Sequence, residues 1–169
     1  MSDHQIGLEM GSQRALVTEP LSVSLLSPAH AEGLRELSRE ADFAGAAGMG
    51  YALSEEGVAE YIASATKAQD DGRSYIFVLT RGTEVLGVCR LIGVLGVPRL
   101  IVSIGASYRG QGNGSLLVRR VLEFAFDTLQ LERVTASGAC LVIVAQCGHV
   151  NGNTLTRQEW LAKRARTGS

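Results

Sequence analysis

The 169-residue sequence has no large excess of charge and no long hydrophobic run, and these absences exclude several partners. Sixteen basic against seventeen acidic residues give a formal net charge of −1, so there is no overall electrostatic footprint for nucleic acid. The longest apolar run, Ala139 to Ala145, is far too short to span a bilayer. The first twenty residues also lack the continuous apolar segment of a signal peptide. We therefore expect no nucleic-acid partner and no membrane partner.

Cysteine is scarce, and its pattern excludes a disulfide framework. The three cysteines, Cys89, Cys140 and Cys147, are odd in number, widely spaced and without a Cys-x-x-Cys pair. With no signal peptide, this pattern predicts reduced thiols in a cytoplasmic protein. Cys140 and Cys147 stand in apolar surroundings, which favours buried, unreactive thiols. No group of His, Cys and Asp has the spacing of metal ligands, so no metal site is expected.

The remaining composition favours one compact domain. The hydrophobic share of 46% is typical of a folded globular chain, and the length suits a single core. We find no internal repeat, low-complexity block or interdomain linker. Residues 1–20 show no strong periodicity and are expected to form a lead-in, with the domain itself spanning residues 21–169.

Hydrophobic periodicity predicts alternating strands and helices. Strands are expected at residues 21–25, 74–80, 85–94, 99–106 and around Val134. Helices are expected after Ser27-Pro28, from Ser54 to Asp70, over 115–129 and over 154–166, with a loop over 44–51. This order, β-α-α-β-β-β-α-β, predicts an α/β (α+β) fold with a mixed, mostly antiparallel sheet and helices on both faces.

Three alternating glycines follow the strand that ends near Ile104. Gly110, Gly112 and Gly114 leave the backbone N–H groups unshielded at the start of the helix over 115–129. A helix N-terminus favours negative charge, so this arrangement suits a phosphate or pyrophosphate. The structural alternative is a mobile turn, but such a turn would not need all three glycines.

Two common phosphate-binding motifs do not fit. A Walker P-loop requires a Gly-Lys pair, and the chain has none. The dinucleotide fingerprint Gly-x-Gly-x-x-Gly fails at Ser115, and no early βαβ unit opens the chain. A nucleotide-binding α/β domain is therefore the least favoured of the functions considered.

The pattern Arg109-Gly-Gln-Gly-Asn-Gly114, between a strand and a helix, resembles the pyrophosphate-binding motif Arg-x-x-Gly-x-Gly of the GNAT N-acetyltransferase superfamily. Residues 21–34 and 124–134 are similar to the ribosomal-protein-alanine acetyltransferase-like branch, and the resemblance is strongest over residues 21–136. It implies acetyl-CoA (CoA) as the cofactor. The amides of residues 111–115 would bind the pyrophosphate, and the strand edge near Ile104 would pair with the pantetheine arm. The implied cofactor-binding residues are Ile104, Arg109, Gly110, Gln111, Gly112, Asn113, Gly114 and Ser115.

The implied activity is direct transfer of acetyl from acetyl-CoA to a primary amine, either a protein or peptide N-terminus or a small amine. Homodimer formation is left open. The catalytic residues are unknown, because the strand over 99–106 has no carboxylate and none of the four tyrosines lies in the last helix. A CoA-binding GNAT-like module with impaired catalysis is therefore the alternative.

The C-terminal third, residues 137–169, departs from the family pattern. Asn151 and Asn153 come about ten residues later than the branch's usual asparagine. The family's last pair of strands is expected to be missing or rebuilt, with residues 139–147 as the candidate segment.

Overall fold

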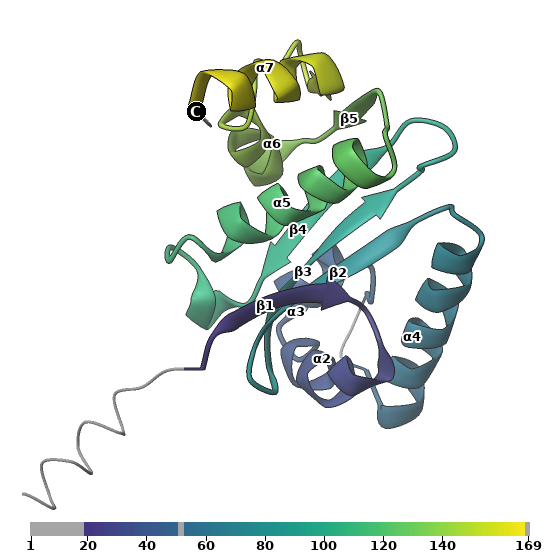
Figure 1. Ribbon diagram of the computed structural model, residues 1–169. Coiled ribbons are helices and arrows are strands. Elements are labelled where there is room, and N and C mark those ends of the chain that lie inside the picture. The colour runs from purple at the N-terminus through teal and green to yellow at the C-terminus, as the bar shows by residue number, and fades with distance from the viewer. Residues whose placement is uncertain (1–18, 51–52, 168–169) are drawn as a thin grey trace, which may run out of the picture.

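The protein forms a six-stranded mixed sheet, seen in a computed structural model that describes residues 19–50 and 53–167 (Figure 1). The strands lie in chain order: β1 Leu21–Leu25, β2 Tyr75–Arg81, β3 Glu84–Ile92, β4 Arg99–Ile104, β5 Arg133–Thr135 and β6 Thr154–Thr156. The pairs from β1 to β4 are antiparallel, β4 and β5 are parallel, and β5 and β6 are antiparallel. The predicted mixed, mostly antiparallel sheet is confirmed. The predicted lead-in falls almost wholly outside the described residues.

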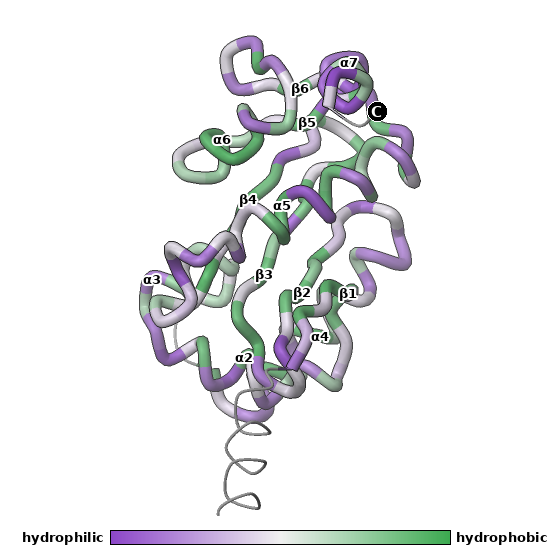
Figure 2. Tube along the Cα trace, turned by 60° about the vertical axis from the view of Figure 1, so that its left-hand side comes forward, coloured by the Kyte–Doolittle hydropathy of each residue, from purple (hydrophilic) through white to green (hydrophobic). Residues whose placement is uncertain are grey.

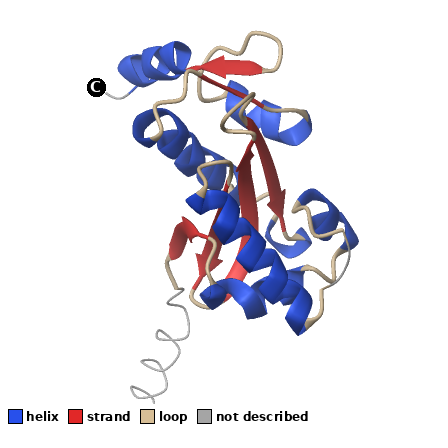
Figure 3. Cartoon of the chain, turned by 90° about the vertical axis from the view of Figure 1, so that its right-hand side faces the viewer, coloured by secondary structure: helices blue, strands red, loops and turns tan. Residues whose placement is uncertain are grey.

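Helices cover both faces of this sheet, as predicted (Figure 3). The first group comprises η1 Pro28–His30, α2 Ala31–Leu37, α3 Ala41–Ala46 and α4 Glu55–Asp70. The second comprises α5 Asn113–Glu123, the π-helical turn η3 Phe124–Thr128, α6 Gly138–Ala145 and α7 Arg157–Thr167, with the short turn η2 Ala106–Tyr108 before α5. None of the helices in the described segments is long and apolar enough to cross a membrane.

Two apolar cores lie on opposite faces of the sheet, and β2 contributes to both. Ile76 and Val78 belong to the core that includes α2, α3 and α4, whereas Phe77 and Leu79 belong to the core beneath α5. Successive side chains of a strand point to opposite faces, so a continuous apolar run is what a central strand requires.

Both α4 and η1, which runs directly into α2, begin at local signals that the sequence carries. Ser54 caps α4, because its Oγ accepts a hydrogen bond from the Gly57 N–H at 3.0 Å. At the earlier start, the Ser27 N–H donates to His30 Nδ1 at 3.1 Å, and Pro28 occupies the first helical position. Both predicted helix starts are confirmed.

The strands β4 and β5 separate almost as soon as they meet. Arg99 and Thr135 form the only β4–β5 pair among the described residues, and the Thr135 N–H donates to the Pro98 carbonyl at 2.8 Å. Beyond this bridge, residues 100–104 of β4 have no strand beside them on the β5 side. This separation leaves a free backbone edge on β4.

Two predicted segments are wrong at the level of secondary structure. Residues 44–46, the first part of the predicted loop over 44–51, belong to α3, because burial of Phe43 and Ala44 offsets the poor periodicity of a short Gly/Ala-rich segment. Residues 138–145 form α6 and not a strand pair. Its buried residues, Cys140 and Val144, are four apart, which is helical spacing that a short apolar run hides. In Figure 2 most of α6 is green, which marks hydrophobic residues.

Other boundaries shift by a few residues. The predicted helix over 115–129 begins at Asn113, and its last turn, from Phe124, is a π-helix. The predicted helix over 154–166 is preceded by the short strand β6, in which Leu155 is buried opposite Val134. A three-residue strand has too short an alternation to be recognised in sequence.

Candidate functional site

A cavity of about 550 Å³ lies beside the free edge of β4. Seven of the eight residues predicted from sequence line it: Ile104, Arg109, Gly110, Gly112, Asn113, Gly114 and Ser115. Its remaining wall comes from β4, α3 and α6, with Asp42 and Ala46 on α3 and Ala139 and Ile143 on α6. The fold therefore gathers the glycine loop, a strand edge and two helices around one space.

The backbone of β4 presents hydrogen-bonding groups toward this cavity. The Gly105 N–H donates to the Leu86 carbonyl on β3 at 2.8 Å, whereas the Pro98 carbonyl accepts from β5. Because consecutive residues of a strand direct their N–H and C=O groups to alternate sides, Val102 and Ile104 direct theirs to the free edge.

The glycine loop is preformed by its backbone and by two side chains. Gly110 and Gly112 have φ values of 73° and 84°, which favour glycine, and a Cβ at either position would meet nothing within 4 Å. Asn113 is 4% exposed and its Nδ2 donates to the Tyr108 carbonyl at 2.9 Å. Gln111 does not line the cavity, and its Nε2 donates to the Ser107 carbonyl at 3.1 Å. The open space above the glycines lies at the N-terminus of α5.

Two charged side chains of opposite sign line the cavity. Arg109 comes from the glycine loop, and its Nε donates to the Ile104 carbonyl at 3.0 Å. Asp42 comes from α3 and is exposed. The described part of the chain contains no group of three or more His, Cys, Asp or Glu residues that could hold a metal ion. The site therefore offers an electropositive loop and one carboxylate.

The cysteine thiols are buried and free of disulfides, as predicted. Burial raises the pKa of Cys140 to about 11, although the nearby backbone N–H of Val102 opposes that shift. Burial also raises the pKa of Cys89 and of Cys147. At neutral pH these thiols are protonated, so none is a ready nucleophile.

No described tyrosine lines the cavity. The Tyr61 hydroxyl donates to the Ala47 carbonyl at 2.7 Å, and burial raises the pKa of Tyr61 to about 12. The Tyr108 hydroxyl donates to Glu84, which raises the pKa of this tyrosine, and the Tyr75 ring packs edge-on against Phe124. Tyr51 lies outside the described residues.

Residues 21–140 match the family described as the acetyltransferase (GNAT) domain. The chain belongs to the GNAT acetyltransferase family. The matched region contains β1 to β5, the whole glycine loop and the start of α6. This GNAT chain is accordingly an enzyme of the acetyltransferase class.

Solved structures share the GNAT fold. A spermidine N-acetyltransferase from Vibrio cholerae, in complex with CoA and spermine, matches with a TM-score of 0.65 and 16% identity, covering 83% of this chain and 98% of that one. A ribosomal-protein-S5-alanine acetyltransferase from Vibrio fischeri matches with a TM-score of 0.69 and 13% identity, covering 86% of this chain and 97% of that one. At these identities the likeness establishes the fold. No curated protein matches the GNAT chain significantly.

Sequence reasoning missed the parts of the site that come from α3 and α6. Asp42 and Ala46 lie in a segment without motif or periodicity, so no local signal marked them. Ala139 and Ile143 are four residues apart and share one face of α6. That spacing was the available signal, but it was hidden within a continuous apolar run.

Proposed function

We propose that this GNAT chain transfers the acetyl group of acetyl-CoA to a primary amine, in a complex that holds both substrates at once. The observation that carries the proposal is the free edge of β4 beside a preformed glycine loop at the N-terminus of α5. The acceptor is a protein or peptide N-terminus, or a small amine.

The residues of the cavity fit acetyl-CoA by chemical type. The N–H groups of residues 111–115 would bind the pyrophosphate at the positive end of the α5 dipole, with Arg109 as an added cation. The Val102 C=O at the free edge would accept a hydrogen bond from an amide of the pantetheine arm, as in an added strand, which leaves the Ile104 N–H for the thioester end of the cofactor. Ala139 and Ile143 would cover the apolar parts of that arm. When bound, acetyl-CoA would supply an acetyl group activated as a thioester.

In the reaction the amine nitrogen forms a bond to the acetyl carbonyl carbon and the carbon–sulfur bond breaks. The protonated amine loses two protons, one of which ends on the departing sulfur and the other in solvent. The free-edge N–H of Ile104 is the chain's donor for the carbonyl oxygen as negative charge develops there. A backbone donor held in a strand needs no reorganisation at that moment.

Binding and turnover separate this proposal from its rivals. Calorimetry with acetyl-CoA, CoA and ATP should show binding of both coenzymes and none of ATP. Thiol release should then follow addition of spermidine or of peptides with a free N-terminal alanine or serine. Binding of ATP alone would overturn the proposal.

A CoA-binding module without catalysis is the second candidate. It is favoured by one observation, the absence of any described tyrosine from the cavity lining. Binding of CoA without thiol release across the whole amine panel would establish it.

A further inference from the structure

The cavity receives residues from both faces of the sheet. Phe43 and Ala44 of α3 are buried in one core, together with α2 and α4. Ile143 of α6 packs against the opposite core, together with α5. Asp42 and Ile143 nevertheless line the same cavity, because β4 and β5 part and leave a gap between the two faces. One ligand can therefore approach along α5 and α6 while another meets α3.

The position of α3 is fixed by contacts with separate elements. Glu40, which immediately precedes α3, accepts a hydrogen bond from the Ala106 N–H at 2.9 Å, just beyond the end of β4. At the other end of α3, Arg90 Nη2 of β3 donates to the Ala46 carbonyl at 2.8 Å. Asp42 lies between these two attachments, so its backbone is anchored even though its side chain is exposed.

Asp42 is the only carboxylate among the described residues that line the cavity. It has no ion-pair partner and no side-chain hydrogen-bond partner within residues 19–50 and 53–167. The cation of the cavity, Arg109, belongs to the glycine loop at the start of α5. The cavity thus offers positive charge on the loop and unneutralised negative charge on α3.

We propose that Asp42 selects the acceptor by binding its ammonium group on the α3 side of the cavity. This inference rests on the proposed function and narrows its substrate class. A carboxylate attracts a cationic amine and repels an acceptor that carries its own carboxylate next to the amine. The acceptors are therefore peptide N-termini or polyamines, and free amino acids are rejected.

The test uses three acceptor probes and three variants of the full chain. The probes are spermidine, an N-terminal alanine peptide with an amidated C-terminus, and free alanine. Asp42→Asn removes the charge at nearly constant shape, whereas Asp42→Glu keeps the charge on a longer side chain. Glu32→Gln is the matched control, since Glu32 is also an exposed acid in a first helical turn but does not line the cavity.

Of spermidine and the amidated peptide, the one that the unmodified chain acetylates better is the reference acceptor. Asp42→Asn should raise the KM for this acceptor about tenfold, while the Kd for CoA and the thermal stability stay unchanged. Asp42→Glu should recover part of that loss, and Glu32→Gln should behave as the unmodified chain. Free alanine should be a poor acceptor for the unmodified chain, and its disadvantage against the cationic acceptors should narrow in Asp42→Asn. An unchanged KM in Asp42→Asn, or free alanine as the best acceptor, would overturn the assignment.

Failure of the inference is distinguishable from failure of the proposed function. If the chain binds CoA but calorimetry on the CoA complex detects neither spermidine nor the peptide, Asp42 does not select a cationic acceptor, whereas the donor site stands. If the chain does not bind CoA, the proposed function itself fails.

Discussion

Arg109 ties the glycine loop to the last residue of β4, because its Nε donates a hydrogen bond to the Ile104 carbonyl at 3.0 Å. A guanidinium carries five N–H donors, so this bond leaves others for an anion. The same side chain can therefore fix the loop and bind a phosphate.

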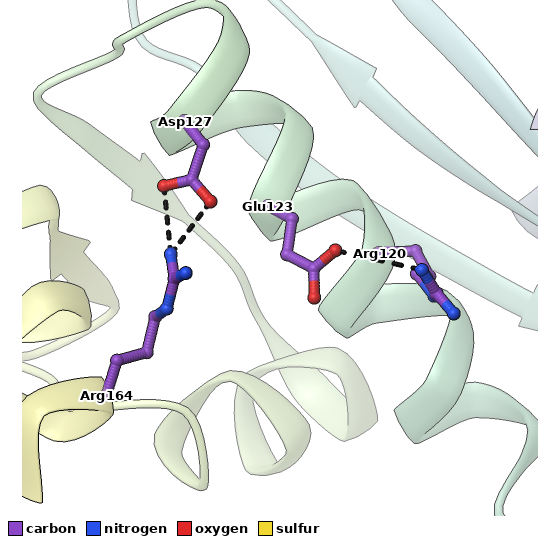
Figure 4. Close-up of polar contacts among 4 residues, drawn as sticks. All are labelled: Arg120, Glu123, Asp127 and Arg164. Atoms are coloured by element: carbon purple, nitrogen blue, oxygen red, sulfur yellow. Dashed lines mark hydrogen bonds and ion pairs between the residues drawn. The ribbon is translucent and has the colours of Figure 1, made fainter. Parts of the chain in front are cut away.

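Arg109→Ala should weaken CoA binding about tenfold, because it removes both the cation and the attachment of the loop. The CoA affinity of Arg109→Lys should fall between those of the unmodified chain and Arg109→Ala, since lysine keeps the charge but lacks the planar guanidinium. Arg120→Ala is the control, because Arg120 lies on α5 outside the cavity, with its Nη1 4.0 Å from Glu123 Oε2 (Figure 4). Calorimetric Kd values check the order, and equal affinity of Arg109→Ala and Arg120→Ala would contradict it.

Two glycine substitutions should separate backbone strain from blockage of the cavity. Gly112→Ala places a side chain at a φ of 84° and should lower the free energy of unfolding by about 1–2 kcal/mol. Gly114 is not in the left-handed region, and a Cβ there would lie 3.4 Å from Ile143 Cδ1.

Gly114→Val should therefore change stability by less than about 1 kcal/mol while abolishing CoA binding, because the branched side chain enters the cavity. Urea unfolding and calorimetry measure the two effects. Normal CoA binding by a folded Gly114→Val variant would show that the loop is not the site.

The stability of the fold should depend on pH through His30. Burial lowers the pKa of His30 below its usual 6.5, and Nδ1 accepts the Ser27 N–H, which requires that nitrogen to be unprotonated. The unfolded chain therefore takes up a proton before the folded chain does. The free energy of unfolding should fall as the pH drops through 6.5, and the fall should level off below the folded-state pKa.

Urea unfolding across this pH range checks the His30 prediction. His30→Gln should be less stable at neutral pH but should show a flatter pH dependence. Identical pH slopes for the two proteins would contradict the assignment to His30.

The contribution of α7 to the stability of the fold should come from burial of Trp160 far more than from the ion pair between Arg164 and Asp127. Trp160 is 5% exposed, and its ring centroid lies 5.7 Å from that of Phe126. Arg164 contacts both oxygens of Asp127, at 3.0 and 2.8 Å, but both side chains are about half exposed (Figure 4). Trp160→Ala should cost about 3–5 kcal/mol, and Arg164→Ala at most about 1 kcal/mol. Chemical denaturation measures both losses, and a loss in Arg164→Ala as large as that in Trp160→Ala would contradict this prediction.

The sequence was sufficient where strong local chemistry and burial agreed. Ser54 before an acidic first turn located the start of α4, and apolar alternation located β2. The loop was recognisable from the alternation of Gly110, Gly112 and Gly114 before a helix, and the first two adopt positive φ values that favour glycine.

The sequence was insufficient where tertiary contacts decide the outcome. The helix α3 exists because Phe43 is buried, and Asp42 reaches the cavity only because β4 and β5 separate. Such long-range contacts produce no hydrophobic periodicity in the residues concerned. The sequence of residues 41–46 alone therefore predicts neither the helix nor the position of Asp42.

The single bridge between Arg99 and Thr135 makes the sheet two hydrogen-bonded ladders joined at one point. A peptide-like cofactor arm bound in the gap between β4 and β5 would supply hydrogen bonds that the sheet lacks there, so the bound coenzyme would stabilise the fold as well as react. A ligand whose free concentration is a hundred times its Kd adds about 2.7 kcal/mol to the free energy of unfolding. The lifetime of this protein in a cell would then follow the supply of coenzyme, with the chain most susceptible to unfolding and proteolysis when that supply is low.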